Sequence, residues 1–137
     1  PEFANIAPET LKGSCPRLLR DFLEVRGLGV LNIRAMFGSN ALRRNKTLRM
    51  IVNMVPFTAE NIDRFDRLGE SQKTRSILST EIPEMTLPVA QGRNLAVLVE
   101  AAARNHMLKI GGYNSAEDFI ERQRLAIQAN TIDQDFE

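Results

Sequence analysis

The sequence predicts an α/β protein, because segments with the alternation of strands are followed by segments with the composition of helices. Leu48 to Val55 has an apolar residue at every second position and ends at Pro56, as expected for a strand. Leu95 to Ala103 consists almost entirely of strong helix formers. At 137 residues, 43% of them hydrophobic, the chain can bury one modest core, so we expect a single domain or a part of one.

The elements before Leu48 are short. Residues 3 to 12 predict an edge strand and a turn closed by Gly13, and residues 16 to 21 predict a short helical turn. Residues 30 to 37 have apolar positions at helical spacing, and Gly38 follows as a helix terminus should. We therefore expect a small amphipathic helix there.

The middle of the chain changes from polar to strand-like. Residues 61 to 73 are the most polar part and predict an exposed, mobile loop. Residues 74 to 89 predict two antiparallel strands on either side of Pro83. They are expected to extend the edge of the sheet.

Two helices are expected at the end of the chain. The first, from Leu95 to the pair Gly111-Gly112, is apolar nearly all round, so we expect it to be deeply buried. The second begins at Ser115, whose hydroxyl is a capping group, and has one apolar and one charged face. Residues 130 to 137 form a polar, acidic tail that we expect to be frayed.

Charge and cysteine content exclude several classes of function. Eighteen basic and seventeen acidic residues give a net charge of +1, which provides no overall field for nucleic acid or an anionic membrane. The cations at residues 43 to 49 have no aromatic residues among them, so we expect no nucleic-acid partner. The lone Cys15 excludes an internal disulfide, and no apolar run approaches the roughly 20 residues needed to span a bilayer. We expect a cytoplasmic protein.

The segment from Glu24 to Asn32 is the most informative part of the sequence. Gly27 and Gly29 permit backbone angles or close approaches that a side chain would forbid. In an extended segment Glu24 and Arg26 would lie on one face, beside a tight turn. Two interpretations remain open on these residues alone: the end of a strand that enters a site, or a buried strand and turn with a surface ion pair.

Four groups of residues, in order and at matching spacing over nearly the whole chain, resemble the bacterial HPr kinase/phosphorylase family. Each motif is weak alone, but four in sequence make coincidence improbable. The motifs are Phe22 to Gly38, Phe65-Asp66-Arg67-Leu68-Gly69, Pro88 to Val97, and Gly111 to Glu117.

The resemblance implies an α/β fold with a mixed sheet flanked by helices, as the C-terminal portion of a P-loop-containing HPr kinase domain. It implies an enzyme that uses ATP and Mg²⁺ to phosphorylate a serine of the phosphocarrier HPr. In the reverse direction, inorganic phosphate attacks phosphoserine and pyrophosphate leaves. It also implies a homo-oligomer, since family members are hexamers.

The phosphate-binding loop of the family has no counterpart here, because no Gly-Lys dipeptide occurs in the chain. We therefore expect residues 1–137 to be the C-terminal portion of the catalytic domain and to be inactive alone. Residues 1–3 are either the translated scar of a cloning site or native strand sequence. The alternative function is a non-catalytic module for oligomerisation or HPr docking, with the second helix as one surface for HPr.

By the same resemblance, Glu24 matches the acidic residue of the signature and is expected to bind the metal. Arg26, Gly27 and Asn94 are expected near the nucleotide or its phosphates, and Arg67 and Arg93 are expected to grip the transferred phosphate. Asn94 also suits the N-cap of the buried helix. Without the resemblance, Arg26 is equally well a structural ion-pair partner, and Arg67 a solvated loop charge. Ala90-Gln91 departs from the Arg-Pro pair of many relatives, which removes one positive charge beside Arg93.

Overall fold

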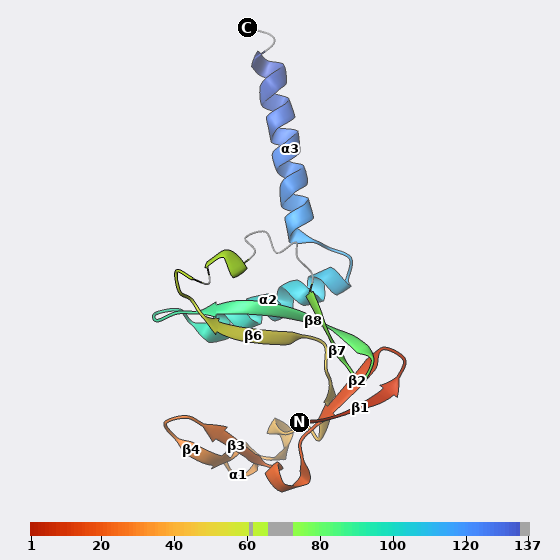
Figure 1. Ribbon diagram of the computed structural model, residues 1–137, viewed down its shortest axis with the longest axis vertical. Helices are drawn as coiled ribbons and strands as arrows, with labels where there is room; N and C mark the ends of the chain where they lie inside the picture. The colour runs from red at the N-terminus through yellow and green to blue at the C-terminus, as the bar shows by residue number, and fades with distance from the viewer. Residues whose placement is uncertain (61, 66–72, 135–137) are drawn as a thin grey trace. The chain divides into compact units, whose positions relative to one another are not determined.

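The computed structural model describes residues 1–60, 62–65 and 73–134 (Figure 1). It confirms the predicted class, α/β with a mixed sheet and helices. The strands are β1 (Glu2–Ala7), β2 (Thr10–Ser14), β3 (Phe22–Val25), β4 (Gly29–Asn32), β5 (Asn45–Thr47), β6 (Ile51–Pro56), β7 (Lys73–Ile77) and β8 (Thr80–Val89). The α-helices are α1 (Ile33–Phe37), α2 (Leu95–Ile110) and α3 (Ser115–Gln134), and the 3-10 turns are η1 (Arg17–Leu19), η2 (Ser39–Ala41) and η3 (Ile62–Arg64).

The chain divides into two compact units. Unit 1 comprises Pro1–Ile51 and Lys73–Glu84, and unit 2 comprises Val52–Gln72 and Met85–Glu137. The strands form sheets in the orders β1-β2-β5, β3-β4 and β6-β8-β7. The strand pairs whose register is defined are antiparallel.

The sheet β1-β2-β5 contains the best-buried residue of unit 1. Leu11 on β2 pairs with Asn5 on β1 and is completely buried. Burying a leucine side chain contributes about 1.5–3 kcal/mol. This residue therefore anchors the small core of the sheet.

The turn between β1 and β2 corrects the expectation for Gly13. The strands are joined at Pro8 and Glu9, and Glu9 has a left-handed φ of 58°. Gly13 instead lies within β2, paired with Phe3. A Cβ at Gly13 would lie 3.3 Å from the Phe3 ring, so this glycine serves close packing and not a turn.

The strands β7 and β8 are joined by Leu78 and Ser79, which corrects the predicted boundary at Pro83. Both turn residues have left-handed φ, 47° and 63°, as in the two-residue turns that suit a twisted hairpin. Pro83 lies within β8, opposite Thr74.

A side chain of β1 secures this turn. Asn5 Nδ2 donates to Leu78 O at 2.7 Å, and Thr80 Oγ1 donates to Asn5 Oδ1 at 3.0 Å. Thr80 is buried, so this bond satisfies a hydroxyl that would otherwise be costly to remove from water. Asn5 thus joins the hairpin β1-β2 to the hairpin β7-β8.

The hairpin β3-β4 replaces the first turn of the helix predicted at residues 30 to 37. Val30 pairs with Glu24, and Leu31 with Leu23, so these residues are in a strand. The helix begins only at Ile33, where Asn32 Oδ1 accepts a hydrogen bond from Ala35 N at 2.9 Å. Its end at Gly38 is confirmed.

Unit 2 contains both long helices, and its helix α2 corrects a prediction about burial. The bounds of α2 agree with the sequence, but Ala102 is its only buried residue. Val97 and Met107 are 59% and 58% exposed. The composition correctly predicts a helix that requires apolar cover, and the described residues of the chain provide little of it.

The start and end of α3 also differ from expectation. Asn114, not Ser115, caps the helix: its Oδ1 accepts from Ala116 N at 3.0 Å and from Glu117 N at 3.3 Å. The Ser115 hydroxyl instead donates to Asn105 at the end of α2. The helix continues to Gln134, through most of the segment predicted to be a frayed tail (Figure 1). No helix within residues 1–60, 62–65 and 73–134 is long and apolar enough to cross a membrane.

Candidate functional site

The glycine-rich turn between β3 and β4 has the geometry that the sequence requires of it. Leu28 N donates to Val25 O at 3.0 Å, which closes a four-residue turn. Gly27, the third residue, has φ of 90°, a left-handed angle that favours glycine. A Cβ on Gly27 would meet nothing within 4 Å, so the requirement is conformational and not steric crowding.

Glu24 precedes this turn and Arg26 lies within it, and the two side chains form no ion pair with each other. Arg26 lies in the turn and not on the strand, because β3 ends at Val25, so the two residues do not alternate on one extended face as predicted. Among the described residues the structure has no ion pair involving either of them. The alternative interpretation of the pair as a surface salt bridge therefore finds no contact to support it.

Glu24 can supply one carboxylate to a metal ion. Mg²⁺ is commonly bound by one or two carboxylates together with water and substrate phosphates, which a single exposed glutamate fits. In the part of the chain that the structure describes, no group of three potential metal ligands comes together. The remaining ligands of a Mg²⁺ ion at Glu24 would be water, phosphate oxygens or groups outside this set.

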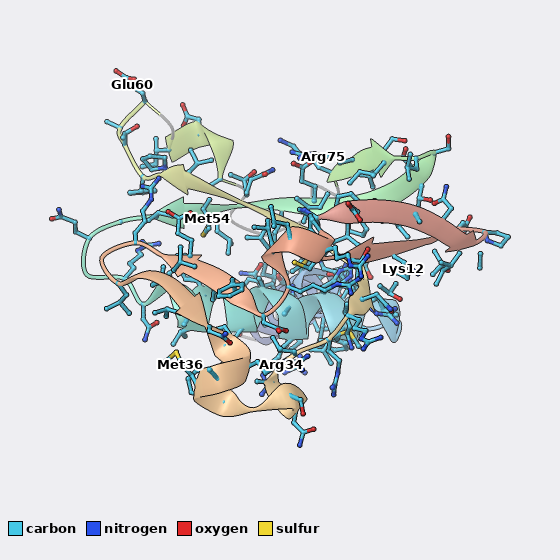
Figure 2. The ribbon with its side chains drawn as sticks, turned by 90° about the horizontal axis from the view of Figure 1, so that it is seen from below. Lys12, Arg34, Met36, Met54, Glu60 and Arg75 are labelled. Atoms are coloured by element: carbon cyan, nitrogen blue, oxygen red, sulfur yellow. The ribbon has the colours of Figure 1, made fainter. Side chains whose placement is uncertain are left out.

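An ion pair that the sequence did not predict supports the hairpin. Asp21 has a left-handed φ of 72°, its carbonyl accepts from Ile33 N at 2.7 Å, and its carboxylate lies 3.2 Å from Arg34 Nε. Arg34 and Met36 leave α1 on opposite sides (Figure 2), as residues two apart on a helix must. Arg34 therefore ties α1 to the start of β3. This role is revealed only by the fold, which brings together two residues thirteen positions apart in the sequence.

The loop between β8 and α2 carries Arg93 on a tight turn. Arg93 N donates to Ala90 O at 3.3 Å, and Gly92, the residue before it, has φ of 79°. Such a turn requires a glycine at its third position. The backbone of Arg93 is thus fixed on its N-terminal side.

Asn94 fixes the other side of Arg93 and confirms the predicted N-cap. Its Oδ1 accepts hydrogen bonds from Ala96 N at 3.1 Å and from Val97 N at 3.4 Å. The positive end of the α2 dipole lies at this point, where an anion is favoured. Because the cap occupies the Asn94 oxygen, the side-chain amide nitrogen is the group left for a ligand. A role for Asn94 toward nucleotide stays a prediction.

The Arg93 side chain is held by an aromatic pair that the sequence analysis missed. Its Cζ lies 5.4 Å from the centroid of the Phe57 ring, within the range of a cation–π interaction. Phe57 in turn contacts Phe65, with centroids 5.7 Å apart and ring planes at 39°. Phe57 N donates to Val89 O at 2.9 Å, which anchors the pair to the end of β8. The signal available in the sequence was an aromatic residue directly after Pro56.

The predicted site residues therefore fall into separate parts of the chain. Glu24, Arg26 and Gly27 lie in unit 1, and Arg93 and Asn94 lie together in unit 2. Arg67 and the rest of its motif after Phe65 lie outside the described residues. Of the loop predicted at residues 61 to 73, the structure describes η3, Phe65, which is partly buried, and Lys73, the first residue of β7.

The two arginines on the charged face predicted for α3 form ion pairs within the helix. Arg122 Nε lies 2.9 Å from Asp118 Oδ1, and an Arg124 nitrogen lies 2.6 Å from Glu121 Oε1. Tyr113 Oη donates to Asp118 at 2.5 Å. This bond, followed by that from Arg122, lowers the pKa of Asp118, and it raises the pKa of Tyr113. Both arginines are thus engaged before any partner arrives.

Comparisons with known proteins identify the family of this chain. The family model of the HPr serine kinase C-terminal domain matches residues 1–123. The HPr kinase/phosphorylase of Neisseria meningitidis is 50% identical over 129 residues, which cover 94% of this chain and 40% of that protein. That of Nitrosomonas europaea is 48% identical over 132 residues, 96% of this chain and 41% of the relative. The chain thus spans about two fifths of the length of these relatives.

A solved structure gives the same assignment. The structure of the Hpr(Ser) kinase/phosphatase from Coxiella burnetii aligns with a TM-score of 0.71 at 28% identity, covering 86% of this chain and 70% of that one. The motifs around the two glycine turns are therefore found in a chain whose sequence and fold both match one family. The chain belongs to the family of the HPr serine kinase C-terminal domain.

Proposed function

We propose that this chain contributes the phosphate-handling loop of a cytoplasmic HPr kinase/phosphorylase, which transfers phosphate to and from a serine of HPr. The observation that carries the proposal is Arg93, placed over Phe57 at the N-terminus of α2. Both relatives compared above are named for this activity. The longer length of those relatives supports the view that a nucleotide cradle lies outside these residues.

The two directions of the reaction place the same demand on this loop. In the kinase direction the serine hydroxyl gives up its proton to a base, and its oxygen bonds to the γ-phosphorus of ATP as the bond to ADP breaks. In the reverse direction inorganic phosphate attacks phosphoserine, the serine oxygen leaves and takes a proton, and pyrophosphate is released. In both, negative charge is spread over the oxygens of the moving phosphoryl group. A planar guanidinium binds two such oxygens at once.

Each residue of the site has a corresponding role in this proposal. Mg²⁺, when bound with ATP, would neutralise phosphate charge, and Glu24 would be its ligand from this chain. Arg26 and the turn at Gly27 would lie near the nucleotide, and Arg93 and the α2 N-terminus would bind the phosphoryl group. Arg67 keeps its predicted role on the second phosphate-gripping loop. We expect the 137-residue chain alone to show no turnover, because these groups do not replace a phosphate cradle.

Arg93→Ala in the complete enzyme tests the proposal. Loss of a charge-assisted hydrogen bond of about 1.5–3 kcal/mol should lower the rate of phosphorolysis about 10- to 100-fold. The matched control is Arg104→Ala, because Arg104 lies on α2 and pairs with Glu100 on the exposed surface of that helix. Equal rates for the two variants with serine-phosphorylated HPr and inorganic phosphate would contradict a phosphate-binding role for Arg93.

A second function, a docking or oligomerisation module, is favoured by one observation. Phe119, Ile120 and Ile127 on α3 are between 41% and 66% exposed, although the sequence predicts that they form the apolar face of an amphipathic helix. Such side chains are usually covered by another surface. Sedimentation of the chain separates the two functions: a discrete oligomer supports the module, and a monomer opposes it.

A further inference from the structure

Phe57 lies where two segments of unit 2 meet. It is the first residue after β6, and its backbone N–H donates to Val89 at the end of β8. Arg93, four residues after Val89, contacts the same Phe57 through its ring. The ring is thus fixed to the end of a strand, while the arginine comes from the loop that leads into α2.

The contact leaves the hydrogen-bonding edge of Arg93 available. A guanidinium over an aromatic ring is attracted to the face of that ring. Its own N–H donors lie in the plane of the guanidinium and point outward from its edge. No carboxylate in the described ranges lies within ion-pair distance of Arg93. An arginine that is held and has open donors is prepared to bind an anion at low entropic cost.

Phe65 supports the ring from another segment. Its centroid lies 5.7 Å from that of Phe57, with the ring planes at 39°, and this separation is within the range of aromatic contacts. Phe57 is 40% exposed, and Phe65 covers part of the ring that solvent would otherwise contact. The pair restricts the rotation of the ring on which Arg93 rests.

We infer that Phe57 is a positioning residue for Arg93, and that its ring holds the guanidinium in the orientation that binds a phosphate group. This inference rests on the proposed function. Phe57 does not touch the phosphate in this arrangement; it acts through Arg93. A cation–π contact at an exposed site corresponds to about a two- to fivefold effect on affinity. We expect loss of the ring to weaken phosphate binding by that factor.

Nuclear magnetic resonance of the 137-residue chain tests the inference, with inorganic phosphate as the probe. The Arg93 Nε–H signal, assigned by its loss in Arg93→Lys, should carry a ring-current shift. Phe57→Leu should remove the shift and raise the phosphate Kd two- to fivefold, whereas Phe57→Trp should keep both near their original values. Phe65→Leu, which retains the Phe57 ring, should give a smaller change in the same direction.

Phe37→Leu is the matched control, because Phe37 is an exposed phenylalanine of α1 that contacts no cation or ring among the described residues. It should leave both readings unchanged. In the complete enzyme, Phe57→Leu should raise the KM for phosphate more than it lowers kcat, a difference that general loss of structure would not produce.

The possible failures are distinguishable. If the original chain binds phosphate at Arg93 and Phe57→Leu binds it equally well, the positioning role is overturned and the proposed function stands. If phosphate leaves the signals of Arg93 and the Gly92-Arg93-Asn94 amides unmoved in the original chain, the phosphate role of this loop is overturned. The Phe57–Arg93 contact would then be packing only, and the inference would fall with it.

Discussion

Unit 1 and unit 2 are stabilised in different ways. Unit 1 holds Leu11, Ile82 and Thr80 at 0%, 4% and 7% exposure. The pairing of β2 with β5 and the hydrogen bonds of Asn5 to Leu78 and Thr80 join distant parts of the chain there. Of the residues described in unit 2, only Ala102 is buried. The helices of unit 2 depend instead on local contacts, namely caps and ion pairs three or four residues apart. Unit 1 carries its own small core, whereas unit 2 has an apolar helix, α2, whose side chains are mostly exposed.

The two units also differ in charge. Unit 1 contains eleven basic and six acidic residues, a net charge of +5, whereas unit 2 contains seven basic and eleven acidic residues, a net charge of −4. The overall value of +1 therefore conceals two opposite fields. A net charge near zero excludes a field over the whole chain but not a field around one unit. The overall charge therefore does not exclude a charged partner for unit 1 or unit 2 alone.

The largest effect should come from the core of unit 1. Leu11→Ala removes a fully buried side chain and should lower the free energy of unfolding of unit 1 by about 2–5 kcal/mol. Val97→Ala removes a side chain that is 59% exposed on α2 and should change stability by no more than about 0.5 kcal/mol. Urea unfolding, monitored by amide hydrogen exchange, measures the change in unfolding free energy for both variants. Equal losses would mean that the two units do not differ as described.

A smaller effect should come from the start of α2. Asn94→Ala leaves two backbone N–H groups without their acceptor and should cost about 0.5–2 kcal/mol of helix stability. Faster amide exchange at Ala96 and Val97 would register the loss. Asn130→Ala, at an exposed position inside α3, is the control and should not destabilise its helix. An unchanged exchange rate in Asn94→Ala would show that tertiary contacts, not the cap, hold this end of α2.

The smallest effect should be the pH dependence of the start of α3. The pKa of Asp118 is lowered by Tyr113 and Arg122, so its stabilising contribution is present above the ordinary carboxyl pKa and is lost as the pH falls through the lowered value. The pKa of Tyr113 is raised by Asp118, so its contribution is lost as the pH rises above its ordinary pKa. Amide protection at residues 115 to 118 should therefore be greatest between these limits. Asp118→Asn should flatten the profile, and a flat profile in the original chain would refute the coupling.

The sequence predicted elements best where one local pattern decides them. Gly27 and the N-cap at Asn94 have the predicted geometry, because a left-handed angle and an unpaired helix start each require a particular residue type. Gly13 was misread because glycine suits both a turn and a close approach, and only the Phe3 ring distinguishes the two. Val30 was misread because its helical spacing also suits a strand paired with Glu24.

The candidate site was predictable residue by residue but not in its contacts. Arg93 was identified from its motif, but the Phe57 ring beneath it comes from a segment 36 positions earlier and has no spacing signal. The burial of α2 was overestimated for a related reason. Apolar composition shows what a helix requires, whereas exposure depends on which other segments are present to cover it.

The central claim is that the Arg93 loop recognises the phosphate of serine-phosphorylated HPr. Calorimetric titration of this chain with unmodified and serine-phosphorylated HPr, in the presence of Mg²⁺, tests it most directly. We predict saturable binding that is tighter for the phosphorylated form, with the difference lost in Arg93→Ala and kept in Arg104→Ala. Binding that ignores the phosphate, or no binding by a chain shown to be folded, would contradict the claim.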